Sequence, residues 1–240
     1  MLGIDANSFI IISAAFGLLC AFLFFTVRVG FPKTIAGLTQ WAWGCLLMVV
    51  GAVAFTTRGQ LPALFSSYLP NLLIPVGVVF MHRSLGLFGK RLSNQRPLIM
   101  LLIGSAIALA WVTFVVDDYR GRVMVVSSLL TVLFAACCSS IYSYRVKRFP
   151  EWFTCAIYAA TAAVMAARFI SVLMYEGTLT LRNDDSAIHN IYFSAFPFSL
   201  VAMSLGAVVQ IVYEGRANRL YVQAAHAAST AAQISGVVCP

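Results

Sequence analysis

Seven apolar stretches, each long enough to cross a lipid bilayer, occupy most of this 240-residue chain. A membrane-spanning helix needs roughly 20 mostly apolar residues, because the hydrocarbon core of a bilayer is about 30 Å thick. Hydrophobic residues make up 61% of the chain and charged residues 10%, which leaves little material for a soluble domain. The sequence therefore predicts an all-α integral membrane bundle of seven transmembrane helices, at residues 8–27, 38–55, 64–81, 98–116, 123–142, 152–175 and 191–212.

The positions of the basic residues predict how this bundle is oriented, since Lys and Arg concentrate in short cytoplasmic loops. With the N-terminus outside and the C-terminus cytoplasmic, eleven of the 16 basic residues lie in cytoplasmic segments and four in outer segments. The remaining one, Arg168, lies within the sixth stretch. The expected location is the bacterial inner (cytoplasmic) membrane, and the lipid bilayer is the expected partner. Nucleic-acid binding is not expected, because topology alone makes these loops basic.

Two domains are predicted: a transmembrane domain over residues 1–212, and a cytoplasmic helical stalk with a disordered tail over residues 213–240. Apolar residues recur in the stalk at spacings of four and three, as in a heptad seam, at Tyr213, Ala217, Leu220 and Ala224. This pattern favours a parallel homodimer through a signal-transmitting stalk. A monomeric, frayed helix is the alternative, because Gly215 lowers helix propensity and alanine seams are weak.

Arg168 is the charged residue that lies within a predicted span. A charge in hydrocarbon is costly and normally faces the bundle interior with a partner. Four polar residues are predicted at a similar depth in the outer half of the bundle: Asn71, Ser128, Thr131 and Ser199. One hypothesis is a ligand pocket that opens outward and binds a small anionic ligand, such as a carboxylate, at Arg168. The alternative is that Arg168 reaches the outer interface, or bonds to Asn71 and to carbonyls near Pro70 or Pro75.

No catalytic, metal or cofactor site is predicted. His82 and His189 are expected in loops at opposite faces, and none of the cysteines falls in a predicted outer loop. The cysteines are expected to act as small apolar packing residues, with the adjacent Cys137 and Cys138 on different helix faces. The alanine-rich sixth stretch is expected to lie centrally, since small residues let helices approach closely. The tryptophans near span ends are expected at the membrane interface.

The chain resembles the membrane input region of bacterial membrane-bound diguanylate cyclases that carry a GGDEF domain. The resemblance extends over about residues 1 to 226. It is carried by Gly37-Leu38, Trp41-Ala42, Gly51, Arg58-Gly-Gln-Leu-Pro62, Asn71-Leu72, Gly77, Gly86-Leu-Phe-Gly89 and the segment from Ala217 to His226. In that family the segment after the linker histidine begins a catalytic domain that makes cyclic di-GMP from GTP.

These 240 residues contain no GGDEF sequence, and His226 is followed by an Ala- and Ser-rich tail. The expectation is a noncatalytic signal-input module, left by truncation or frameshift or acting as an orphan sensor. The alternative function is a small-solute transporter or channel, because Pro70, Pro75 and Pro197 interrupt predicted spans as in broken transporter helices. A retinal protein is not expected, since the last stretch lacks a lysine for a Schiff base.

Overall fold

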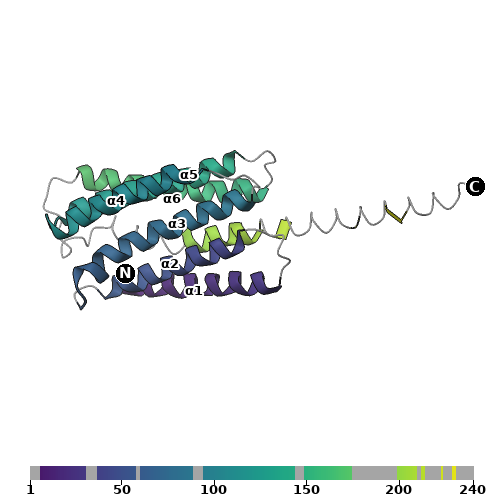
Figure 1. Ribbon diagram of the computed structural model, residues 1–240, viewed down its shortest axis with the longest axis horizontal. Helices are drawn as coiled ribbons and strands as arrows, with labels where there is room; N and C mark the ends of the chain where they lie inside the picture. The colour runs from purple at the N-terminus through teal and green to yellow at the C-terminus, as the bar shows by residue number, and fades with distance from the viewer. Residues whose placement is uncertain are drawn as a thin grey trace, which may run out of the picture.

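The computed structural model is a bundle of long helices that run along a common direction (Figure 1). It describes residues 6–30, 37–57, 60–88, 94–143, 149–174, 199–209, 212–213, 223 and 229–230. The helices are α1 (Ala6–Gly30), α2 (Leu38–Thr56), the π-helical turn η1 (Leu64–Tyr68), α3 (Leu69–Phe88), α4 (Arg96–Phe114), α5 (Tyr119–Tyr142), α6 (Phe149–Met174) and a further apolar helix, Ser199–Val209.

Among the described residues, five helices are long and apolar enough to cross a membrane: α2, η1 with α3, α4, α5 and α6. Within α1 the apolar segment is Ala14–Val29, and the last helix is Ser199–Val209. The predicted multi-pass, all-helical character is thus confirmed, with seven helices where seven stretches were predicted. Which end of the bundle is cytoplasmic remains a prediction. Short connections make successive helices alternate in direction, so α1, α3 and α5 finish at one end, called here the predicted cytoplasmic end.

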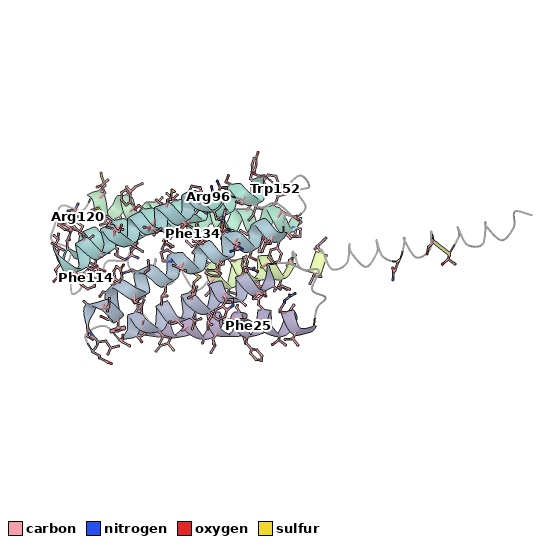
Figure 2. All side chains as sticks on the ribbon, viewed as in Figure 1. Phe25, Arg96, Phe114, Arg120, Phe134 and Trp152 are labelled. Atoms are coloured by element: carbon pink, nitrogen blue, oxygen red, sulfur yellow. The ribbon has the colours of Figure 1, made fainter. Side chains whose placement is uncertain are left out.

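Large apolar side chains cover the outside of the bundle, as a hydrocarbon solvent allows. On α4 they include Met100, Ile107 and Trp111, which are 71%, 68% and 62% exposed. Figure 2 shows such side chains projecting outward all along the helices. In water these faces would be a large exposed apolar surface, whereas in a bilayer they are the lipid contact. The helix faces therefore fit a membrane location.

The described helices pack as a ring. α1 packs on α2, α2 on α3, α3 on α5, and α5 on both α4 and α6. The Ser199–Val209 helix closes the ring, because it contacts α1, α2 and α6. Gly17 of α1 lies against Leu200, Cys45 of α2 lies against Ser204, and Thr154 of α6 lies against Gly206.

The closest approach of two helices joins α2 to α3. A side-chain carbon added at Gly44 would lie 2.9 Å from the carbonyl oxygen of Gly77, and one added at Gly77 would lie 2.8 Å from that of Gly44. Both distances are shorter than real contacts of a Cβ atom allow. Gly37 and Gly51 flank this crossing at seven-residue spacing on α2, against Ser84 and Ile74. Small residues at heptad spacing thus give the two backbones van der Waals contact along their length.

The π-turn η1 comes just before Pro70, and this proline explains why the helix widens there. A proline ring clashes with the carbonyl four residues earlier in an α-helix, here that of Ser66, and it cannot donate a hydrogen bond. The wider π-turn removes this clash by adding a residue to the turn. Ser66 is buried, and its hydroxyl donates to the carbonyls of Leu61 and Pro62, both at 3.3 Å. Helix α3 then continues without interruption through Pro75 to Phe88.

Three expectations from the sequence are wrong. His82 lies inside α3 and is 3% exposed, because this helix runs seven residues past the predicted end of the third span. Trp41 is fully buried between Phe24 and Phe88, with ring centroids 6.0 and 6.4 Å away, so it is a core residue and not an interface anchor.

The alanine-rich helix α6 is the third correction, because it lies at the edge of the bundle. Its buried residues include Thr154, Tyr158, Thr161 and Met165, and its exposed face carries Ala156, Ala159, Ala160, Ala163 and Ala167. An alanine is small enough for close helix packing, yet it is equally compatible with lipid, so alanine content permits a central position without requiring it.

We expect Gly77→Val to lower the thermal stability of the detergent-solubilised protein, because the added side chain meets the Gly44 carbonyl. Overpacking of this kind costs about 1–3 kcal/mol. The matched control is Gly104→Ala on α4, where an added carbon meets nothing within 4 Å. This control should be neutral or slightly stabilising in a helix interior. Equal melting temperatures for the two variants would contradict the proposed α2–α3 crossing.

The orientation can be tested with single cysteines in a background that lacks Cys239. Gln60 and Asn94 are exposed and lie at opposite ends of the bundle. We expect a membrane-impermeant maleimide to label Gln60→Cys in intact cells, and to label Asn94→Cys only after permeabilisation. The opposite pattern would show that the predicted topology is inverted.

Candidate functional site

Helices α5 and α6 pack antiparallel with one constant register, which determines the α5 residue that lies opposite Arg168. Near the predicted outer end, the Arg120 guanidinium donates to the Leu173 carbonyl at 2.9 Å. Further along, the rings of Phe134 and Tyr158 lie 6.1 Å apart. In this register Arg168, which is half-buried, lies opposite Val125.

The residues of the predicted outer polar layer lie at different levels along the helices. At 1.5 Å per residue, Ser128 and Thr131 lie about 4.5 and 9 Å farther along the α5 axis than Val125. Asn71 is on α3, which does not pack along α6. Ser199 is half-buried at the start of the last described helix.

Three of the predicted ligand-binding residues already donate hydrogen bonds within their own helices. The Asn71 side-chain nitrogen donates to the Ser67 carbonyl at 2.7 Å. The hydroxyls of Ser128 and Thr131 donate to the carbonyls of Val125 and Ser127, at 3.0 and 2.7 Å. These bonds satisfy polar groups in a helix without any ligand. Ligand binding at Arg168 therefore stays a prediction.

A second polar group was not predicted, and it lies toward the opposite, predicted cytoplasmic end. The His82 ring on α3 shares a hydrogen bond with the Ser140 hydroxyl on α5, with 2.8 Å between Nε2 and Oγ. His82 Nδ1 is buried and has no hydrogen-bond partner among the described residues. Helices α1, α2 and α3 form one half of the ring, and α4, α5 and α6 form the other. The contact joins the two halves, because α3 packs on α5. A buried polar pair of this kind fixes how two helices dock.

Two polar contacts of the helix Ser199–Val209 lie toward this same end. The Cys45 sulfur lies 4.0 Å from the Ser204 hydroxyl. The Thr154 side chain fills the space beside Gly206, where an added carbon would lie 2.5 Å from the Thr154 hydroxyl oxygen. Ser204 and Thr154 are both buried. The last helix is thus seated on α2 and α6 by small and hydroxyl-bearing side chains.

Two cysteines also meet at this end. The sulfur atoms of Cys138 on α5 and Cys155 on α6 are 3.0 Å apart. The neighbouring Cys137 is fully buried, which agrees with the prediction that the adjacent pair points to different faces. Sequence reasoning missed the contact because Cys138 and Cys155 are brought together only by the α5–α6 register.

The described residues contain no group of three or more His, Cys, Asp and Glu side chains that could hold a metal ion. Arg122 of α5 forms an ion pair with Asp117 of the α4–α5 connection, with 3.3 Å between nitrogen and oxygen. Of the predicted stalk residues, Tyr213 is helical and exposed, and Ala217, Leu220 and Ala224 lie outside the described residues.

Comparison of the chain with protein-family models, with curated proteins and with solved structures finds no match.

We expect Ser140→Ala to destabilise the bundle by about 1–3 kcal/mol, because it leaves His82 Nε2 without its hydrogen-bond partner inside the bundle. Ser139→Ala is the matched control, since Ser139 is exposed and the Ser143 hydroxyl donates to the Ser139 backbone carbonyl, which the substitution keeps. Thermal unfolding in detergent compares the two variants. A control that is as destabilised as Ser140→Ala would refute a structural role for the His82–Ser140 bond.

Proposed function

We propose that this chain is a membrane-embedded signal-input module of the cyclic di-GMP type, noncatalytic in its 240 residues. The observation that carries the proposal is the position of the Ser199–Val209 helix. It contacts α1, α2 and α6, and it is the helix that leads into the C-terminal segment. A change in the packing of any of these helices can therefore move the element that continues toward the C-terminus.

The contacts of this helix allow it to slide or rotate slightly against its neighbours. Its buried face consists of Leu200, Met203, Ser204, Gly206 and Ala207, and its outer face exposes Leu205 and Val208. Small residues at helix interfaces let a helix slide or rotate by 1–2 Å without opening a large cavity. The resemblance to input regions of diguanylate cyclases includes residues 217–226, which follow this helix in the chain, and it supports the same proposal.

The stimulus proposed from the sequence is a small anionic ligand at Arg168 from the outer side. Arg168 is on α6, the same helix that carries Thr154 against Gly206. Binding at one end of α6 could therefore reach the last helix at the other end along a single rigid element. A ligand that binds two positions of α6 with equal affinity does not change their populations. The ligand must therefore bind one position of α6 more tightly than the other.

The transporter alternative depended on helices broken near the membrane midplane. Helix α3 runs continuously through Pro75, from Leu69 to Phe88, and Pro197 lies outside the described residues. The described part of the chain thus gives this alternative less support than the proline positions suggested.

The proposal is tested by fusing the chain at His226 to a competent GGDEF domain and measuring cyclic di-GMP in cells at matched membrane expression. We expect Gly206→Leu to change the output several-fold, because the new side chain must displace Thr154. Val208→Leu adds bulk at an exposed position of the same helix and should leave the output unchanged.

Two further arms complete this test. Arg168→Ala should alter the output if the ligand site is at Arg168, and the unfused chain should make no cyclic di-GMP. Product from the unfused chain would overturn the noncatalytic assignment. Equal output from the Gly206→Leu, Val208→Leu and unmodified fusions would argue against transmission through the last helix.

A further inference from the structure

The contact between Cys138 and Cys155 joins two helices at a point that bears on the last helix. Their sulfur atoms are 3.0 Å apart, and the Cys155 thiol also points toward the Cys138 carbonyl oxygen at 3.7 Å. Cys155 is buried and Cys138 is half-buried. The two residues lie four residues before the end of α5 and six after the start of α6, about 6 and 9 Å from the helix ends.

The separation of the sulfurs favours a disulfide over a shared metal ion. A disulfide needs the sulfurs about 2.05 Å apart, so they would move closer by about 1 Å. Two thiolates on a tetrahedral zinc ion, with zinc–sulfur bonds of about 2.3 Å, must be nearly 4 Å apart. Metal binding would thus force the two helices apart, and the described residues offer no third ligand group here.

We propose that Cys138 and Cys155 are an oxidisable dithiol site, which a membrane-permeant hydroperoxide converts into a disulfide between α5 and α6. The more exposed Cys138 reacts first, as its thiolate attacks one peroxide oxygen and the oxygen–oxygen bond breaks. This step gives a sulfenic acid on Cys138 and releases water, or an alcohol from an organic peroxide. The Cys155 sulfur then attacks the Cys138 sulfur, the disulfide bond forms, and the hydroxyl leaves as water with the thiol proton. The two thiols lose two electrons, and the peroxide gains them.

The disulfide would fix α6 at the residue next to Thr154, which packs against Gly206 of the last helix. Oxidation would thus restrain the helix pair beside the contact through which we propose that signals leave the bundle. This second consequence depends on the proposed function, whereas disulfide formation itself does not.

The test uses the full chain in lipid nanodiscs, treated with hydrogen peroxide, blocked with N-ethylmaleimide and digested with trypsin. Cleavage at Arg122, Arg145, Arg148 and Arg168 places the two thiols on separate peptides, residues 123–145 and 149–168. We expect these peptides to become linked and to separate with dithiothreitol. Free thiols should fall from the six of the sequence to about four.

Serine variants identify which cysteines form the disulfide. Cys138→Ser and Cys155→Ser should each abolish the linked peptides, and Cys138→Ala guards against a folding effect of the hydroxyl. Cys137→Ser is the matched control and should retain the link. A link that survives in Cys138→Ser, or no link in the unmodified chain, would overturn the proposal. Thiols that are protected without a link and are released by a metal chelator would also overturn it, in favour of a bound metal ion. This readout needs no output domain, so its failure and that of the fusion experiment are distinguishable.

Discussion

The contact of α2 with α3 at Gly44 and Gly77 sets the spacing of the rest of the bundle. Lipid tails are as apolar as the side chains they would replace, so helix association in a membrane depends on close packing and on hydrogen bonds. A Cβ atom added at either of these glycines would lie less than 3 Å from the carbonyl oxygen of the other. Gly37, Gly51 and Gly77 are also among the residues that carry the resemblance to diguanylate cyclase input regions. In this chain close packing explains Gly51 and Gly77, and Gly37 also has a positive φ of 104°. These glycines therefore have a structural explanation that is independent of any function.

Three contacts between polar side chains of different helices lie in one half of the bundle. His82 with Ser140, Cys45 with Ser204, and Cys138 with Cys155 each join two different helices near the predicted cytoplasmic end. In the other half, the hydroxyls of Ser128 and Thr131 bond within their own helix. The half that leads to the C-terminal segment is thus held by specific side-chain pairs. In the opposite half, the Arg120 guanidinium donates to the Leu173 carbonyl and the Tyr68 hydroxyl donates to the Ala106 carbonyl.

The sequence predicted the helices well, because a membrane span is defined by length and apolar composition, and both are local properties. It predicted the neighbours of each side chain poorly. Trp41 and Trp43 both lie in the first two turns of α2, yet Trp41 is buried and Trp43 is 46% exposed, because Trp41 alone faces Phe24 and Phe88. The predicted third span ends at Met81, which puts His82 in a loop, whereas α3 continues through Arg83 to Phe88. The Cys138–Cys155 contact depends on the register of two helices, which no residue in either helix specifies alone.

The π-turn at Leu64–Tyr68 holds one more residue than an α-helical turn of the same rise. Each residue of an α-helix advances the chain by about 100° around its axis. The extra residue therefore sets the angular phase of everything after it, including the direction in which Gly77 and His82 point. A single-residue deletion within the turn, which would restore α-helical winding at the expense of a clash at Pro70, would rotate α3 by more than a quarter of a turn relative to the segment before it. The extra residue of the turn thus sets the rotation of α3 that directs Gly77 toward α2 and His82 toward α5.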